Sequence, residues 1–298
     1  MNNYIYILPH KVENVNNTNG RIKIITQKSS LIMGKSNSLD IVKEILENAD
    51  RTKVEDLFER LQYRLSKTNL QKMIYFLRDN NLIYLSKDVL SEGDINFLYF
   101  LSQYTISLDK YLKKMKNMQF RLIAEGDNLA FVKEILEGFG LNNSLLQEEQ
   151  LNELDNRNII LSCFDSTTLD KLENLAEKIE GNKGLLWTFV LFYDDSFLLS
   201  PILNQFNYTD FYSFSKQVDL EHLREKGIAK NILVQRMGIC EMILNVLTSI
   251  MKLNIQTTYD KTIIYDSLDK TLLFEKIYCF PKDFNGMELN VQRWDGEV

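Results

Sequence analysis

The sequence predicts a fold of mixed class, in which a small α+β module is followed by an α/β domain. Before residue 35, apolar side chains alternate with polar ones in short segments, which is the period of a β-strand. Up to residue 80 they then recur every three or four residues, which is the period of helices. From residue 118 onward, apolar strands alternate with amphipathic helices, as in a parallel sheet covered on both faces. We therefore expect a module over residues 1–88, a helical linker over 89–117 and a larger domain over 118–298.

Three short antiparallel strands are expected at the start of the module. Tyr4 to Leu8 (YIYIL) alternates aromatic and β-branched side chains and ends at Pro9, and an Asn-rich loop follows over residues 13–20. Arg21 to Gln27 (RIKIITQ) alternates Ile with polar residues. Ser30 to Gly34 (SLIMG) follows after a tight connection and forms the third strand.

Three short helices follow the strands. We expect Ser38 to cap the first helix through its hydroxyl, Asp50 and Thr52 to start the second, and Ser66 or Thr68 to cap the third. The apolar faces of the three helices consist of Ile41, Ile45, Leu46, Val54, Leu57, Phe58, Leu61, Leu70, Met73, Ile74 and Leu77.

A returning strand completes the module. The third helix ends at Asn80-Asn81, where a left-handed residue is tolerated, and Leu82 to Leu85 (LIYL) closes the unit. Strands, three short helices and a returning strand are typical of a winged helix-turn-helix.

The rest of the chain has the pattern of a linker and an α/β domain. Residues 89–117 are helical and amphipathic and end in the basic run Lys113 to Lys116, which we interpret as a solvated helix end. The expected strands of the domain are 120–124, 159–164 and 185–192, with helices at 129–139, 168–179 and 233–251, and a hairpin of 262–266 with 272–279.

Composition favours a reduced, cytoplasmic protein that binds a partner. The net charge of −6 is uneven, because residues 1–88 hold 14 Lys and Arg against 10 Asp and Glu, or +4, which leaves −10 for the remainder. The module therefore suits an acidic partner. No segment has the pattern of a membrane span or of an export signal, so no membrane partner is expected.

Residues suited to catalysis or metal binding are sparse. Cys163, Cys240 and Cys279 form no CxxC pair, and the two histidines, His10 and His222, are expected to be exposed. Adjacent acids at 148–149 and 194–195 are more typical of solvated surface than of a general acid and base. We expect no catalytic residue, no metal and no cofactor.

The first strand-to-helix turn of the α/β domain is where a phosphate-binding loop would lie. It retains only Gly126, because Ala124 adds a methyl group at the tightest point of the turn. Glu125 and Asp127 place carboxylates beside any incoming anion. The turn therefore argues against ATP binding.

Recognition of a partner is then the expected role, and the module offers two kinds. The third helix, with Lys67, Lys72 and Arg78, could read DNA, but the acidic chain lacks the basic footprint of a DNA reader, and we expect no nucleic-acid partner. Alternatively, Ser30 to Gly34 is the edge of a small sheet beside the third helix. An extended peptide can pair with such an edge and place apolar side chains in the groove.

The order YIYILP, a loop, RIKIITQKSSLIMGKS, three helices and LIYL resembles the RiPP recognition element, a winged-helix module that binds leader peptides of ribosomally made, modified peptides. The remaining chain resembles a degenerate ThiF-like, E1-like domain of Rossmann type. Its end, LLFEKIYCFP, is similar to the closing hairpin of proteins that work with YcaO-type cyclodehydratases in thiopeptide and other thiazole- or oxazole-forming pathways. The likeness covers nearly the whole chain and lies in layout and short apolar patterns.

The resemblance implies a non-catalytic scaffold that binds a precursor leader peptide and presents its core to a YcaO cyclodehydratase, which uses ATP to form azolines. Further implied partners are a flavin-dependent azoline dehydrogenase and a second copy of the chain within a larger complex. The implied peptide-binding residues are Ser30, Leu31, Ile32, Met33, Gly34, Lys35, Leu70, Met73, Ile74 and Leu77. Lys35 and Lys72 would assist an acidic leader.

The sequence departs from many relatives in lacking paired CxxC motifs and a complete glycine fingerprint, which argues against zinc binding and adenylation. An E1-like adenylating enzyme and a winged-helix DNA-binding regulator remain the alternatives.

Overall fold

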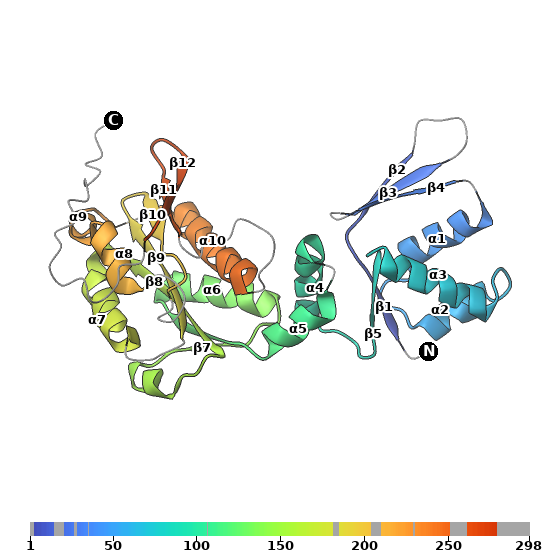
Figure 1. Cartoon of the computed structure of the whole chain (residues 1–298), viewed down its shortest axis with the longest axis horizontal. Helices are drawn as coiled ribbons and strands as arrows, with labels where there is room; N and C mark the ends of the chain where they lie inside the picture. The colour runs from blue at the N-terminus through green and yellow to red at the C-terminus, as the bar shows by residue number, and fades with distance from the viewer. Residues whose placement is uncertain are drawn as a thin grey trace. The chain divides into compact units, whose positions relative to one another are not determined.

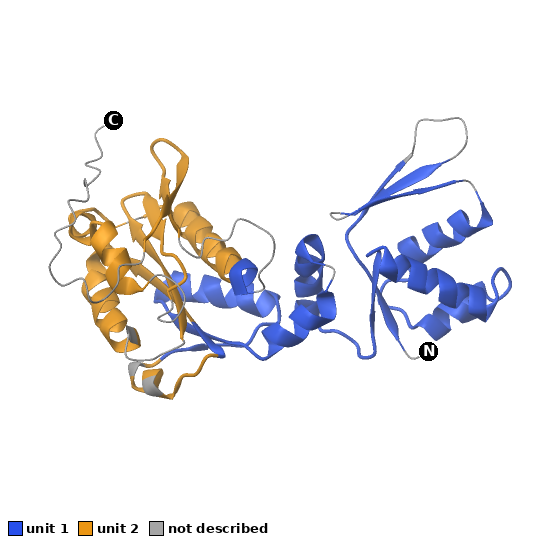
Figure 2. Cartoon of the chain, in the orientation of Figure 1, with its two compact units in different colours: residues 1–146, 157–159, 247–257 blue, residues 147–156, 160–246, 258–298 orange. Residues whose placement is uncertain are grey.

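The computed structural model describes residues 3–14, 21–26, 29–34, 36–105, 107–180, 185–203, 210–228, 230–250 and 261–278. Contacts divide the chain into two compact units (Figure 2). Unit 1 holds residues 1–146, 157–159 and 247–257, and unit 2 holds 147–156, 160–246 and 258–298.

The N-terminal strands of unit 1 form two small sheets (Figure 1). β2 (Lys11–Asn14), β3 (Ile22–Ile25) and β4 (Ser30–Met33) form one antiparallel sheet in the order β2-β3-β4. β1 (Tyr4–Ile7) pairs antiparallel with the returning strand β5 (Ile83–Ser86).

The expected pairing of the first three strands was therefore wrong. Tyr4 to Leu8 does not pair with the two strands that follow it, and β2 forms partly within the segment expected to be a loop. Ile5 and Tyr6 are both buried, so β1 lies inside the module, where the returning strand supplies its hydrogen-bond partners.

The helices of the module are α1 (Asn37–Asn48), α2 (Val54–Leu61) and α3 (Lys67–Asp79). The hydroxyl of Ser66 accepts a hydrogen bond from the Asn69 amide at 3.3 Å, as one of the two expected caps of the third helix. The start of α1 differs from expectation, because Ser36 rather than Ser38 is its cap.

The start of α2 was also misplaced. The helix begins after Lys53, and the Asp50 carboxylate accepts a hydrogen bond from the Ile7 amide at 2.9 Å instead of capping a helix. Asp50 thus ties β1 to the α1–α2 connection, a contact distant in sequence that periodicity cannot reveal.

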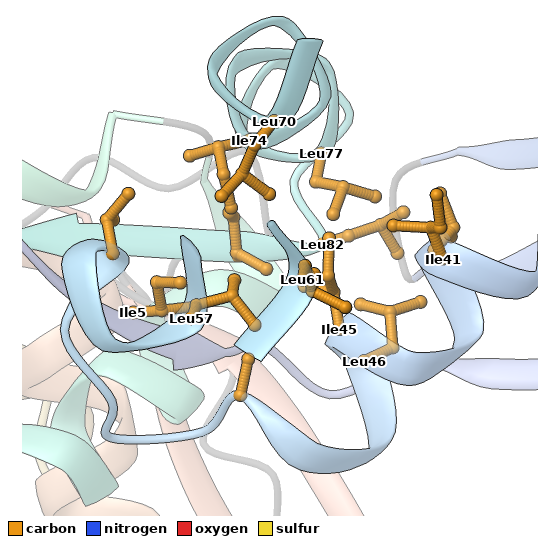
Figure 3. Packing of buried hydrophobic residues seen from close by; sticks show 14 of the residues in the cluster. Ile5, Ile41, Ile45, Leu46, Leu57, Leu61, Leu70, Ile74, Leu77 and Leu82 are labelled. Atoms are coloured by element: carbon orange, nitrogen blue, oxygen red, sulfur yellow. The ribbon is translucent and has the colours of Figure 1, made fainter. Parts of the chain in front are cut away.

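One apolar core holds the strands and helices of the module together. Leu70, Ile74 and Leu77 point from α3 toward the other two helices (Figure 3). The buried members of this core are Ile5, Ile22, Ile24, Leu39, Ile41, Val42, Ile45, Leu46, Ala49, Val54, Leu57, Leu61, Leu70, Ile74, Leu77, Leu82 and Ile83. Leu31, Met33 and Met73 pack against it with partly buried side chains.

The segment expected to be a helical linker forms two helices, α4 (Glu92–Tyr104) and α5 (Leu108–Lys116). Side chains connect both to the module. Arg51 forms an ion pair with Glu92, and the Tyr84 hydroxyl donates to Asp109. The linker is therefore held to the module by polar contacts as well as by the chain.

The remaining strands form a seven-stranded sheet in the order β12-β11-β10-β9-β8-β6-β7. The bounds are β6 (Gln119–Ile123), β7 (Asn143–Leu145), β8 (Asn158–Asp165), β9 (Leu186–Tyr193), β10 (Ser196–Leu199), β11 (Lys261–Asp266) and β12 (Thr271–Lys276). The other helices are α6 (Gly126–Gly138), α7 (Leu169–Glu180), α8 (Phe211–Gln217), α9 (Leu220–Arg224) and α10 (Ile232–Ile250), with 3-10 turns at Glu148–Glu153 and Ser166–Thr168.

This sheet is mixed; the sequence predicted parallel strands from the strand–helix alternation and a hairpin at the end. β6 and β7 pair parallel, but the pairs from β9 to β12 are antiparallel. The chain reverses at Asp194-Asp195, where Asp194 adopts a left-handed φ of 45°. Asp194 also accepts a hydrogen bond from the Gly227 amide at 2.8 Å, so this acidic pair serves a turn. The final hairpin forms as expected, although its second strand ends at Lys276, and Cys279 lies outside the described residues.

Helix α10 is long and apolar enough to cross a membrane by length and composition. One face of it nevertheless packs within unit 2. An added Cβ at Gly238 would lie 2.9–3.0 Å from side-chain atoms of Phe192, Phe197 and Val190, on β9 and β10. This close approach is typical of a core helix packed on a sheet.

Candidate functional site

Strand β4 is an edge of the three-stranded sheet, with β3 as its neighbour among the described strands. The β3–β4 hairpin closes with a hydrogen bond from the Thr26 amide to the Ser29 carbonyl at 2.8 Å. Directly opposite residues of an antiparallel pair alternate between hydrogen-bonded and non-hydrogen-bonded. Thr26 and Ser29 form a hydrogen-bonded pair, and the next pair, Ile25 with Ser30, is therefore not hydrogen-bonded. The pair after that, Ile24 with Leu31, is hydrogen-bonded again.

The residues between these bonded positions direct their backbone groups away from β3. Met33 opposes Ile22 in the next bonded pair, so Ser30 and Ile32 occupy the alternate positions. The amide and carbonyl of Ile32 therefore face the open edge of the sheet. This is the orientation that an added strand requires.

Side chains of β4 alternate in the same way. Leu31 and Met33 are partly buried against the core, whereas Ile32 is 59% exposed on the opposite face. Ser30 and Gly34 are exposed, and Lys35 lies outside the described residues. A strand added to this edge would extend both faces of the sheet.

The opposite edge of the sheet is strand β2, which differs from β4 in carrying charged side chains. Lys11 and Glu13 on β2 form a salt bridge at 2.7 Å. Charged side chains are a common means by which proteins protect an edge from pairing with another strand. β4 carries no charged residue, so it is the less protected of the two edges.

The four residues of α3 that the resemblance implies for peptide binding fall into two groups by their exposure. Leu70, Ile74 and Leu77 are at most 1% exposed and belong to the core. Met73 is partly buried and has an accessible surface. Of the four, only Met73 offers its side chain to a ligand in this conformation.

Phe76 was missed by sequence reasoning. It is 39% exposed and lies three residues after Met73, so the two occupy one flank of α3. The signal was an aromatic residue just outside the apolar face of the helix. This flank of α3 therefore carries apolar side chains that are partly exposed.

The other flank of α3 faces α2. A hollow of about 30 Å³ lies there between Val54, Glu55, Phe58, Lys67, Leu70 and Gln71. A hollow of this size has room for a few water molecules.

Arg78 is occupied by neighbours on its own helix. Its guanidinium pairs with Asp79 at 2.8 Å and lies 4.8 Å from the centre of the Tyr75 ring. One of the three basic residues that could contact DNA phosphates is therefore engaged within the protein.

The turn between β6 and α6 has the geometry expected for its residues. Gly126 has a φ of 54°, which favours glycine, while the side chains of Glu125 and Asp127 are exposed on either side of it. Both carboxylates are placed to repel an anion at the helix start.

Elsewhere among the described residues, two features bear on chemistry: one cysteine on β8 and the dispersion of groups that could bind a metal. Desolvation raises the pKa of the Cys163 thiol on β8 to about 12, which suppresses the thiolate. Across the described ranges, no three His, Cys, Asp or Glu side chains gather as metal ligands would.

Comparisons with known proteins show a likeness of fold. No family model and no curated protein matches the sequence. Among solved structures, the heterocyclase TruD aligns at a TM-score of 0.64 and 12% identity, covering 94% of this chain and 42% of that one. A heterocyclase in complex with substrate and cofactor aligns at 0.64 and 12%, covering 92% and 38%.

E. coli MccB, solved with AMPCPP and MccA, aligns at a TM-score of 0.52 and 10% identity, covering 93% of this chain and 98% of that one. The present chain thus spans less than half of the heterocyclase chains and nearly all of MccB. From these alignments, the chain has a fold related to that of heterocyclases and of MccB.

Proposed function

We propose that the chain is a scaffold subunit that binds the leader peptide of a ribosomally made precursor and presents the core peptide to a YcaO cyclodehydratase. In this proposal, residues 1–88 are a winged-helix recognition element and 89–117 a linker. Residues 118–298 form a degenerate ThiF-like domain. Azoline formation, followed by oxidation to thiazoles, is carried out by the partner enzymes.

The open edge of β4 is the observation that carries the proposal. An incoming strand would pair with the outward amide and carbonyl of Ile32. Its alternate side chains would then lie on the core side of the sheet, near Leu31 and Met33. We propose that they also reach the flank of α3 that holds Met73 and Phe76. Main-chain pairing would supply affinity, and these apolar contacts would supply specificity.

The likeness to heterocyclases supports the type of reaction in which the chain takes part. The alignment with TruD covers 94% of this chain, so the N-terminal module is included in it together with the α/β part. In this proposal, the chain holds the peptide substrate while the active site of a partner enzyme modifies it.

Adenylation of a peptide is the second candidate function, and it is favoured by the alignment with MccB in the presence of AMPCPP. The exposed carboxylates of Glu125 and Asp127 weigh against it, because they flank the turn where a triphosphate would approach. The scaffold role is therefore the better supported of the two.

A titration tests the proposal. The full chain is titrated with the fluorescently labelled leader of a precursor peptide encoded beside its gene, and with a scrambled leader as control. We expect saturable binding of the leader alone. Equal binding of both peptides, or of neither, would sink the leader-binding role. ATP-dependent pyrophosphate exchange by the isolated chain would instead establish the adenylating enzyme.

A further inference from the structure

Strand β6 carries an arginine, Arg121, at its centre. Burial alternates along the strand: Phe120 and Leu122 are buried on one face, whereas Gln119, Arg121 and Ile123 are half-buried on the other. Arg121 therefore lies on the less covered face of β6. Because its guanidinium is partly withdrawn from water, the groups that it contacts decide whether its charge is stabilised.

Two neutral side chains hold the guanidinium in place. Its Nε donates to Asn158 Oδ1 on β8 at 2.9 Å, and its Nη1 donates to Ser144 Oγ on β7 at 2.6 Å. Ser144 lies directly opposite Arg121 in the parallel pair of β6 and β7, so both side chains point to the same face. The guanidinium is thereby fixed across the adjacent strands β7, β6 and β8.

Within the described part of the chain, no carboxylate forms an ion pair with Arg121. A guanidinium is always protonated, and a charge withdrawn from water is normally balanced by an opposite charge. Arg224, the other half-buried arginine that the structure describes, shows that arrangement. It pairs with Asp170, with Glu173 at 2.8 Å and with Glu221 at 3.3 Å. Arg121 has similar burial without the anion.

Arg121 also retains donors for an anion. A guanidinium has five N–H donors, and the two bonds above use one on Nε and one on Nη1. The remaining donors, both on Nη2 and one on Nη1, have no partner among the described residues. The Ser144 hydroxyl accepts from Arg121, which leaves its own proton to donate.

We propose that Arg121 and Ser144 form a binding site for a carboxylate group. A planar guanidinium can hold a carboxylate through two parallel hydrogen bonds, which are stronger than those to neutral acceptors. Its single positive charge matches one carboxylate, whereas a phosphate group carries more negative charge. Ile123 on the same face offers apolar contact for the carbon atoms of the ligand. The inference does not depend on the proposed peptide binding at β4.

Nuclear magnetic resonance of the guanidinium tests the proposal. The full chain is prepared with isotope-labelled arginine, and the Nε–Hε signals of Arg121 and Arg224 are assigned by their loss in Arg121→Lys and Arg224→Lys. Sodium acetate is titrated at about pH 6, where the carboxylate is ionised, against sodium chloride of equal ionic strength. We expect a saturable shift of the Arg121 signal with acetate. The Arg224 signal should stay in place, because carboxylates of the chain already occupy it.

Ser144→Ala removes the hydroxyl and keeps the charge of the site. Loss of this one hydrogen bond should weaken acetate binding by about two- to tenfold. Gln119→Ala is the matched control, because Gln119 is half-buried on the same face and its side chain does not bond to Arg121. Its acetate affinity should stay within about twofold of the original value. Thermal unfolding checks that both variants are folded, and equal affinity of the two would overturn the site as proposed.

Two peptides distinguish the sources of the carboxylate. One carries a single glutamate, and the other has glutamine in its place. Tighter binding of the glutamate peptide than of acetate would identify an acidic side chain of a peptide or protein as the source, whereas equal affinity would identify a free carboxylate. Both results support the site.

Three results would overturn the proposal. The first is an Arg121 signal that responds to acetate no more than to chloride. The second is an equal shift of the Arg121 and Arg224 signals, which would show a general effect of the salt. The third is inorganic phosphate that binds Arg121 about tenfold more tightly than acetate, which would assign the site to phosphate groups instead.

Discussion

Gly93 on α4 and Gly140 after α6 are in direct backbone contact. A Cβ atom added to Gly93 would lie 2.4 Å from the amide nitrogen of Gly140 and 2.7 Å from its Cα atom. Gly140 itself has a φ of 62°, and the Asn96 side chain donates to the Gly138 carbonyl at 3.0 Å nearby. The linker helix α4 is therefore packed against the end of α6 with no room for a side chain between them.

Substitution of Gly93 by Ala should destabilise the protein. The added methyl group meets backbone atoms that cannot move without displacing α4 from α6, and overpacking of this kind costs about 1–3 kcal/mol. Urea unfolding followed by circular dichroism measures the loss. Gly138→Ala is the control, because an added Cβ there meets no atom within 4 Å. Equal stability of Gly93→Ala and Gly138→Ala would contradict the close approach.

Substitution of Ile32 by Pro should weaken leader binding without unfolding the module. The Ile32 amide faces the open edge, so proline removes no bond between β3 and β4, yet it removes a donor for the added strand and places its ring there. We expect the dissociation constant to rise by about 10- to 100-fold. Fluorescence anisotropy with labelled leader measures the change.

Val12→Pro is the matched control for that experiment. By the same alternation, the Val12 amide faces the open edge of β2, on the other side of the sheet. Leader affinity should stay within about twofold of the original value. A larger loss in Val12→Pro than in Ile32→Pro would place the peptide on β2.

Truncation of Phe76 should also reduce leader affinity. The ring lies on the same flank of α3 as Met73, where it would cover apolar side chains of an added strand. Loss of such a contact costs on the order of 1–2 kcal/mol, or about 5- to 30-fold in affinity. Isothermal titration calorimetry of Phe76→Ala measures it. Tyr75→Ala is the control, since Tyr75 is equally exposed at 39% but points to the other flank.

Cys163 should resist alkylation in the folded protein. Desolvation raises the pKa of its thiol to about 12, so the thiol form predominates at pH 8. The raised pKa means that the folded state favours the thiol, and reactivity should increase sharply when urea unfolds the chain. Iodoacetamide labelling of the Cys240→Ser/Cys279→Ser variant, read by mass spectrometry, measures both rates. Rapid labelling without urea would show an accessible thiolate.

Much of the local structure follows from the sequence alone. The change of apolar period from two to 3.6 residues marks the transition from strands to helices. Ser66 is one of the two residues, with Thr68, that the sequence offers as a cap for α3. The acids beside Gly126 are likewise evident without coordinates. These features depend on a residue and its near neighbours, which is why periodicity and capping chemistry predict them.

Only the tertiary structure decided which surfaces are available. β1 pairs with β5, about eighty residues away, and α3 presents Met73 and Phe76 while Leu70, Ile74 and Leu77 are covered. Periodicity identifies one face of a helix or strand, but the elements that cover that face come from distant parts of the chain. The direction of the Ile32 amide was decided in the same way, because it depends on which strand pairs beside β4.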